Sequence, residues 1–386
     1  MFGQIGNRRT RMSEVKATDY RFKILYAVGI IVLVCGHAQG GGISLANDWF
    51  PYGGVHLALF VFCSGYFYKR SSEENVKKYI FKKIKTLLLP LYIYTVLYGV
   101  LVQLLKLKGF EIGGKFTVHN LFIAPITNGH QFIYNMGGWF IVPLFMIEIC
   151  NILCRKLLKT FNSNISEAVF FVIGIAGGLV GNQLACAGYI SGWWLVLVRM
   201  LYFLPFYNLG TFYKSHLEKL DKRIPSFWLF TAVFFIKLLI AWIYGKMPSY
   251  TPSWCHNFTE GPVMPILTEY VGIIFWMRIA TILEPVMGRS KWINLIADNT
   301  YSIMMNQFLG FMIVKTVYAV FNKLHLAFAD FDWVSYKTDI WWYYKPKGLG
   351  YTLIIYVVAG IVFSIMVQKA VDAIIYQMKI RFWEEA

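Results

Sequence analysis

Residues 24–37 read ILYAVGIIVLVCGH, and this stretch decides the class of the protein. The run is apolar until it ends on a histidine, His37, and a glycine-rich break follows at 39–42. The next apolar segment, 55–68, begins beside a second histidine, His56. An ionisable imidazole is costly inside a bilayer, so two of them at adjacent segment ends indicate a site that faces protein or water. A membrane protein that carries this pair is a candidate enzyme.

Similar apolar runs recur along the whole chain of 386 residues, which is 57% hydrophobic and only 15% charged. This composition makes the bilayer, not water, the main solvent. We therefore expect an all-α, polytopic membrane protein with about ten transmembrane helices. The predicted spans are 24–37, 55–68, 86–105, 139–154, 167–185, 192–213, 226–244, 263–283, 300–321 and 349–376.

The connections between these spans are too short to form a separate folded domain. We expect one integral-membrane domain over 1–386, with a basic segment at 1–23 and no appended soluble domain. If the N-terminus is cytoplasmic, the inner segments hold 26 Lys and Arg and the outer loops hold 8. This bias predicts that both termini are cytoplasmic. The net charge of +17 then reflects topology and contact with anionic membrane lipid, so we expect no nucleic-acid partner.

Two charged residues are predicted at similar depth inside the bilayer. Glu148 lies within the fourth span and Arg199 within the sixth, which makes them a plausible ion pair. Such a pair either holds helices together or takes part in catalysis, and the sequence leaves both open. Cys150 and Cys154 lie one helical turn apart, but no second Cys or His pair has metal-site spacing, so we expect no metal.

A polar stripe follows one face of the ninth span. Asn299, Ser302 and Asn306 are three and four residues apart, which places them on the same side of a helix. Such a stripe either hydrogen-bonds a neighbouring helix, which is the commoner use, or lines a cavity.

Two features outside the spans complete the candidate site. Lys82, Lys83 and Lys85 precede the third span; they act either as a topology signal or as a landing site for a phosphate-bearing donor. The outer loop 322–348 holds Trp341, Trp342 and further aromatics among aspartates. These aromatics would suit sugar rings, although they could equally form an interfacial belt.

Several motifs occur in an order that a known family shares. The segments are Tyr26–His37 (YAVGIIVLVCGH), Val55–Phe67 (VHLALFVFCSGYF), Lys82–Leu91 (KKIKTLLLPL), Trp139-Phe140-Ile141, Arg199 with Phe203–Phe206 (FLPF), and Asn299–Phe308 (NTYSIMMNQF). In these motifs the chain resembles the integral-membrane acyltransferase-3 family. It is most similar to the branch of fucose 4-O-acetylase-like proteins and polysaccharide or exopolysaccharide O-acetyltransferases. The resemblance covers essentially all ten spans.

The chain departs from the family pattern at three places. Tyr26 stands where the family has a basic residue eleven positions before the histidine; Lys23, one turn lower on the same stripe, is the candidate substitute. Leu57-Ala58 replaces a Met-Pro pair, and Asn306 stands where a histidine is common.

The resemblance implies transfer of an acyl group, expected to be acetyl, from cytoplasmic acyl-CoA. The acceptor would be a hydroxyl of a cell-surface or lipid-linked glycan at a bacterial inner (plasma) membrane. Acetyl-CoA would be a co-substrate and not a permanently bound cofactor. A homodimer is compatible with the sequence. A transporter or flippase and a non-catalytic glycan-export partner are the alternatives.

Residue roles follow from this resemblance. His37 would take the proton of the acceptor hydroxyl, with His56 or Glu148 as its partner. Arg199 or Asn306 would stabilise the oxyanion. The expected catalytic face comprises His37, His56, Glu148, Arg199, Asn306, Lys23 and Tyr26. The expected donor contacts are Lys82, Lys83 and Lys85. The expected acceptor contacts are Trp139, Asn299, Ser302, Trp341 and Trp342.

Overall fold

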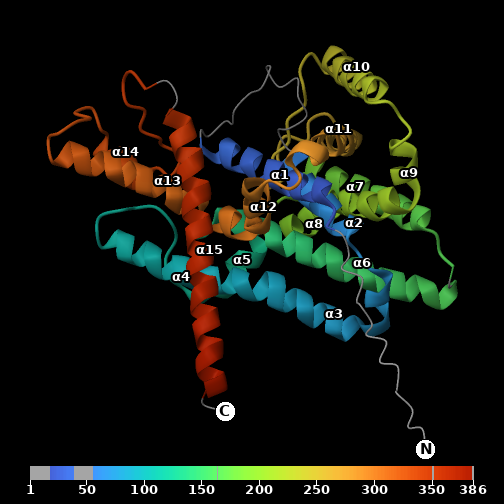
Figure 1. The fold of residues 1–386 in the computed structure, drawn as a ribbon, viewed down its shortest axis with the longest axis horizontal. Coiled ribbons are helices and arrows are strands. Elements are labelled where there is room, and N and C mark those ends of the chain that lie inside the picture. The colour runs from blue at the N-terminus through green and yellow to red at the C-terminus, as the bar shows by residue number, and fades with distance from the viewer. Residues whose placement is uncertain (1–17, 39–54, 163, 350–351, 385–386) are drawn as a thin grey trace, which may run out of the picture.

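The computed structural model describes residues 18–38, 55–162, 164–349 and 352–384, and in these ranges the chain is helical without a named strand (Figure 1). The long helices are α1 (Tyr20–Ala38), α4 (Leu89–Lys106), α6 (Ile141–Phe161), α7 (Glu167–Cys186), α8 (Gly192–Phe212), α10 (Ser226–Tyr244), α11 (Val263–Met287), α13 (Thr300–Lys323) and α15 (Thr352–Glu384). The shorter ones are α2 (Val55–Tyr66), α3 (Val76–Lys83), α5 (Ala124–Thr127), α9 (Glu218–Asp221), α12 (Lys291–Asp298) and α14 (Trp333–Thr338).

The prediction of an all-α membrane protein is confirmed. Within the described residues, nine helices are long and apolar enough to cross a membrane, and α2 is a further, shorter apolar helix. At 12 residues, α2 is about 18 Å long, well short of a hydrocarbon core of about 30 Å. The glycine-rich break after α1 and most of the basic N-terminal segment lie outside the described residues.

The third span differs from its prediction. We expected residues 69–85 to connect two spans, but helical structure runs without a break over Arg70–Lys106. A short π-helical stretch, Ile84–Leu88, joins α3 to α4 directly before Pro90. Proline lacks a backbone N–H and clashes with the preceding turn, and a π-bulge is one way a helix accommodates such a disturbance. The basic lysines therefore lie on the helix itself.

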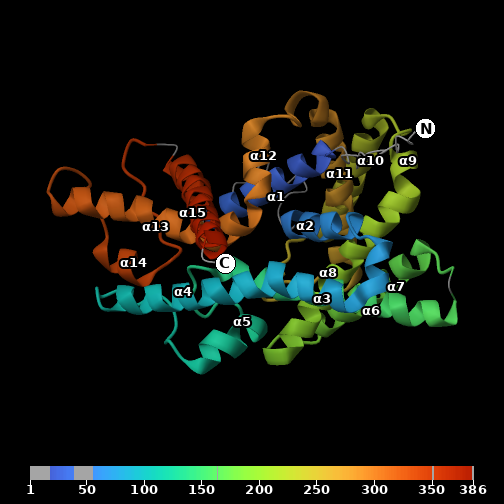
Figure 2. The ribbon, with the colours of Figure 1, turned by 60° about the horizontal axis from the view of Figure 1, so that its bottom comes forward.

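The packing places α1 and α8 in the middle of the bundle. Helix α1 contacts α2, α11, α12, α13 and α15, while α8 packs against α7, α2 and α6. In both views α4 and α13 lie alongside each other, joined by the Tyr98–Asn306 hydrogen bond (Figures 1 and 2). The C-terminal part of α15 projects beyond the other helices (Figure 1).

Hydrogen bonds divide the connections between two faces. On the first face, the Glu111 N–H donates to the Lys337 carbonyl oxygen, and the Tyr343 hydroxyl donates to the carbonyl oxygen of His37. We call this the His37 face; it comprises the end of α1 and the connections 107–135, 187–191, 245–262 and 324–349. The opposite, Lys83 face comprises the connections 67–75, 164–166, 213–225 and 288–299, which bonds such as Arg70–Glu167, Arg278–Asp221 and Lys23–Asp298 tie to the helices.

Candidate active site

His37 lies near the C-terminal end of α1 among aromatic rings. Its imidazole is 5.1 Å from the Phe308 ring and 5.9 Å from the Trp341 ring, centroid to centroid. The Gln307 side chain is a polar neighbour of the ring. The Nδ1 atom of His37 is buried and has no hydrogen-bond partner among the described residues. A buried nitrogen without a partner costs free energy, so it is suited to meet a group that the structure does not contain.

The loop 324–349 covers this histidine and is fixed at two points. The Tyr343 hydroxyl donates to the carbonyl oxygen of His37 at 2.6 Å. Lys315, buried on α13, donates to the carbonyl oxygen of Ile340 at 2.8 Å, and its ammonium lies 4.5 Å from the centroid of the Tyr343 ring. These contacts hold Trp341, predicted as an acceptor contact, beside His37. Trp342 lies instead against Phe331, at 5.2 Å, within the aromatic interior of the loop.

Arg199 ties two further connections to the same face. Its guanidinium donates to the carbonyl oxygen of Asn128 at 3.1 Å and, through two of its nitrogens, to the carbonyl oxygen of Ser253. The group also lies over the Trp139 ring, 4.8 Å from the centroid. Arg199 is 1% exposed, and the partners that the structure shows for it are main-chain carbonyls and a ring, with no carboxylate. Its positive charge is therefore not neutralised by a counter-ion in the described part of the chain.

His130 belongs to the group of residues around Arg199, which we call the Arg199 cluster, although the sequence did not single it out. Its ring stacks on Trp254 at 4.4 Å, and Nδ1 lies 3.0 Å from the Asn128 carbonyl oxygen. Burial, and secondarily the positive charge of Arg199, lower the pKa of His130 to about 3. The ring therefore stays neutral at physiological pH, and His37 lies near enough to act on it electrostatically.

The turn that holds His130 requires a glycine. Gly129 has φ +80°, which favours glycine, and a methyl group there would lie 2.4 Å from the Cβ of Trp139. The Asn-Gly pair before a histidine was a turn signal that could have drawn attention to this segment.

The predicted ion pair between Glu148 and Arg199 is wrong. Glu148 pairs instead with Lys83, whose Nζ lies 2.7 Å from its carboxylate oxygens. The prediction used only the depth of each residue along its span, but the lateral positions of the helices decide which groups meet. Because the third span begins earlier than predicted, Lys83 lies on a helix that packs against α6.

The other two predicted donor lysines differ from Lys83. Lys82 and Lys85 are exposed, and the Lys85 ammonium lies 4.9 Å from the centroid of the Phe81 ring. Lys83 is partly buried and engaged with Glu148. The structure therefore leaves Lys82 and Lys85, and not Lys83, accessible to a phosphate-bearing ligand.

The polar stripe on α13 holds helices together. The Asn306 amide donates to the Ser302 carbonyl and hydroxyl oxygens, at 2.8 and 3.0 Å, and accepts from the Tyr98 hydroxyl at 2.8 Å. Ser302 donates to the Ser364 carbonyl oxygen at 2.7 Å, and Asn299 donates to its own helix junction, at Leu295. These contacts match the interhelical alternative; a role for Asn306 as an oxyanion donor would require them to break.

The remaining predicted residues lie lower on α1 and α2. Lys23 pairs with Asp298, and Tyr26 stacks on Phe60 at 5.9 Å. They are 14 and 11 residues from His37, about 21 and 16 Å along the helix, so neither belongs to the group around the imidazole. A methyl group at Gly29 would lie 3.5 Å from the His56 carbonyl oxygen, which places the backbone of His56 beside the middle of α1. Its predicted action on His37 stays a prediction.

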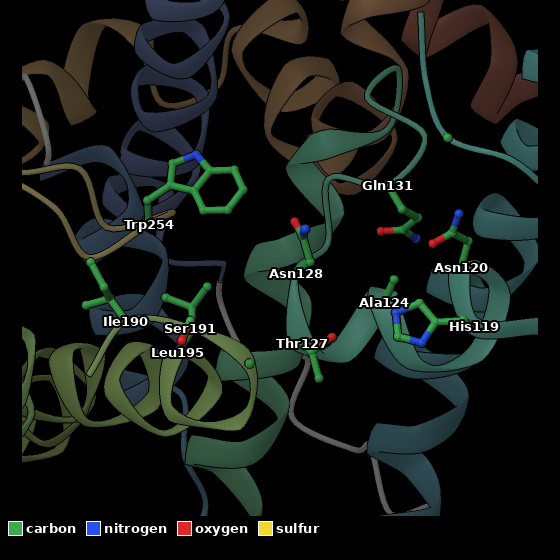
Figure 3. Close-up of a pocket in the computed structure, with 12 residues that line it drawn as sticks. His119, Asn120, Ala124, Thr127, Asn128, Gln131, Ile190, Ser191, Leu195 and Trp254 are labelled. Atoms are coloured by element: carbon green, nitrogen blue, oxygen red, sulfur yellow. The ribbon is translucent and has the colours of Figure 1, made fainter. Parts of the chain in front are cut away.

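A cavity of about 440 Å³ opens beside the Arg199 cluster (Figure 3). Asn128 and Trp254, which contact Arg199 and His130, also form part of its wall. The remaining lining residues are Gly114, His119, Asn120, Ala124, Thr127, Gln131, Ile190, Ser191, Gly192 and Leu195. The sequence singled out none of them, because they come from separate connections and helix ends that are distant from one another along the chain. Among the described residues, no group of three or more His, Cys, Asp or Glu could hold a metal ion.

A known protein family matches most of the chain. The model of the acyltransferase-3 family, described as an acyltransferase domain, matches residues 19–368. Comparisons with curated proteins and with solved structures gave no match. The matched range begins just before α1 and ends within α15, so it includes every group described above. The chain therefore belongs to the acyltransferase-3 family and is a multi-pass membrane acyltransferase.

Proposed function

We propose that the protein transfers an acyl group, expected to be acetyl, from cytoplasmic acyl-CoA to a hydroxyl of a cell-surface or lipid-linked glycan. This would make it an O-acetyltransferase of a bacterial inner membrane, as the resemblance to the polysaccharide-modifying branch implies. The observation that carries the proposal is the buried, unpartnered Nδ1 of His37 beneath Trp341.

The chemistry needs a base at this position. A sugar hydroxyl is a poor nucleophile near neutral pH, and a neutral imidazole within hydrogen-bond reach can take its proton. The hydroxyl oxygen then attacks the thioester carbonyl carbon, the carbon–sulfur bond breaks, and the proton returns from His37 to the leaving CoA thiolate. Attack by His37 itself, which would form an acyl-histidine, would lead to the same products.

Arg199 supports the proposal through its charge. The thioester carbonyl becomes an oxyanion in the transition state, and a fixed positive charge in a water-poor site stabilises it. The guanidinium has no carboxylate partner among the described residues, and two of its five N–H donors remain after its three bonds to Ser253 and Asn128.

The donor would arrive from the Lys83 face. The exposed ammonium groups of Lys82 and Lys85 would attract the phosphates of acyl-CoA. His37 lies at the other end of α1, so the acyl chain of the donor would have to reach through the bundle to meet the acceptor. The charged nucleotide of the donor and the glycan acceptor would then lie at opposite faces of the protein.

The test is acetyl-CoA turnover by the purified protein in nanodiscs, with crude surface glycan as acceptor. His37→Ala and His37→Gln should abolish thioester loss and glycan acylation. The matched control is His256→Ala, since His256 is an exposed histidine on the same face that bonds to Thr251 through its backbone. Folding is checked by thermal unfolding.

Each result leads to a different conclusion. Turnover that persists in His37→Ala would move the base elsewhere, first to His56. No turnover by folded wild-type protein with any acyl donor would favour transport or glycan assembly over this proposal.

A further inference from the structure

The cavity beside Arg199 is built from polar, aliphatic and aromatic groups of several separate segments. Figure 3 shows Trp254, Ile190, Ser191 and Leu195 on one side and Gln131, Asn120 and His119 on the other. Its volume of about 440 Å³ lies within the range of roughly 300–1,000 Å³ typical of small-molecule sites.

One wall presents a polar atom that needs a partner. The Oε1 of Gln131 is buried and has no hydrogen-bond partner among the described residues. The backbone around it is held firmly, because the Gly114 N–H donates to the Gln131 carbonyl oxygen at 2.7 Å. Asn120, next to it in Figure 3, donates to the Lys115 carbonyl oxygen at 2.8 Å, which leaves its own oxygen as an acceptor. The fixed wall therefore offers two amide oxygens to hydroxyl donors.

The opposite wall presents an aromatic surface. The Trp254 ring has one face covered by the imidazole of His130, and the residue remains 38% exposed. An indole combines a large apolar face with one N–H donor. A ring with an apolar face and hydroxyl groups at its edge has the chemistry to contact both this surface and the amides.

The charge of the lining selects among such ligands. The described lining residues include no Asp, Glu, Lys or Arg; the one ionisable side chain is the exposed imidazole of His119. Recognition of a carboxylate or phosphate ordinarily uses Arg or Lys. Amides and hydroxyls, from Thr127 and Ser191, suit a neutral polyhydroxylated ring, because each can donate or accept.

We propose that this cavity binds an uncharged hexose-like unit of the acceptor glycan, held by Gln131 and Asn120 and covered by Trp254. That the sugar unit belongs to the acceptor rests on the proposed function. The chemical class of the ligand rests on the cavity alone. Asn128 and Trp254 belong both to the cavity wall and to the cluster around Arg199 and His130. A ring bound there would therefore be oriented by the same segments that hold Arg199 and His130.

The test measures binding without requiring catalysis. Saturation-transfer NMR is recorded on the full chain in nanodiscs with methyl glucoside, methyl galactoside and methyl mannoside as neutral probes. Methyl glucuronoside and glycerol 3-phosphate are the anionic probes. We expect signals from at least one neutral glycoside and weaker signals from the anions, and we expect them to persist in His37→Ala.

Three variants address the walls of the cavity. Gln131→Leu and Trp254→Ala remove the acceptor atom and the aromatic surface, and Ser191→Phe blocks an exposed position at the rim without disturbing the core. Each should weaken binding of the neutral glycoside, and raise KM for the glycan, by roughly tenfold. Trp193→Ala is the matched control, since Trp193 is 66% exposed and does not line the cavity.

The outcomes separate this inference from the proposed function. Absence of glycoside binding, equal binding in the three variants, or preference for an anionic probe would each overturn the inference. Acyl transfer with an unchanged KM in Ser191→Phe would keep the proposed function and reject the cavity as its acceptor site. Glycoside binding without acyl-CoA turnover would keep the inference about the cavity and reject the proposed function.

Discussion

The two faces of the bundle hold their buried cations in different ways. On the Lys83 face, Arg155 donates to both oxygens of Glu167, at 2.8 and 2.6 Å, and Arg278 meets Asp221 at 2.6 Å. On the His37 face, Arg199 and Lys315 bind main-chain carbonyl oxygens and lie over aromatic rings.

This contrast separates architecture from chemistry. A buried ion pair is internally neutral and fixes helices relative to each other, but it presents little net charge to a ligand. A cation that is held by carbonyl dipoles keeps its charge and can act on a developing anion. We therefore expect changes on the Lys83 face to reduce stability and changes on the His37 face to reduce turnover.

The sharpest change on the Lys83 face is Glu167→Gln. It leaves the buried guanidinium of Arg155 without its carboxylate, which should lower the free energy of unfolding by about 3–5 kcal/mol. Turnover per folded molecule should stay the same. Thermal unfolding and acetyl-CoA turnover are measured together, with the exposed Glu74→Gln as control. A loss of turnover without a loss of stability would contradict the proposed contrast between the two faces.

Arg199→Met is the corresponding change on the His37 face. Removing the charge and the tethers to Asn128 and Ser253 should lower turnover by about 10²–10³. Arg199→Lys should recover part of it, because it keeps the charge but not the forked geometry. The exposed Arg223→Met, on the opposite face, serves as control. Equal turnover in Arg199→Met and wild type would remove Arg199 from the site.

The pH dependence of stability should show the effect of His130. Its pKa is about 3 in the folded protein and 6.5 when unperturbed, so below pH 6.5 the unfolded chain binds a proton that the folded chain rejects. Stability is therefore complete above pH 6.5 and falls toward pH 3, by up to about 1.4 kcal/mol per pH unit.

His130→Gln should flatten that dependence, and the matched variant His256→Gln should not. The readout is the unfolding temperature from pH 7.5 to 5. Identical slopes in wild type and His130→Gln would mean that His130 titrates normally.

Tyr343→Phe should have the smallest effect. It removes the single hydrogen bond to the His37 carbonyl oxygen, worth about 1 kcal/mol, and should lower turnover several-fold while acetyl-CoA affinity stays constant. The exposed Tyr376→Phe is the control. A loss of turnover as large as that of Arg199→Met would show that the loop does more than position His37.

Much of this molecule could be predicted because membrane solvation dictates it. Apolar runs marked the spans. The imidazole at the end of a span drew attention to His37, and Trp341, chosen from the aromatic outer loop, lies beside it; the catalytic role of His37 stays a prediction. Pairing was not predictable to the same degree. Spacing along a helix gives depth at 1.5 Å per residue, but it does not tell which helix stands beside it, so Glu148 was assigned to Arg199 instead of Lys83.

The cluster around His130 was missed for a different reason. It depends on a positive φ at Gly129 and on contacts between Arg199 and connections 71 and 54 residues away in sequence. The periodicity that identifies helices carries no information about such connections.

The bond between Tyr343 and His37 has a practical consequence for trapping complexes. Because the tyrosine holds the main-chain oxygen of residue 37 and not its ring, any non-proline residue at this position keeps the anchor of the covering loop. A variant that lacks the imidazole of His37 should thus keep its fold and still bind both substrates. Such a protein, loaded with acetyl-CoA and glycan together, offers a stable ternary assembly for imaging.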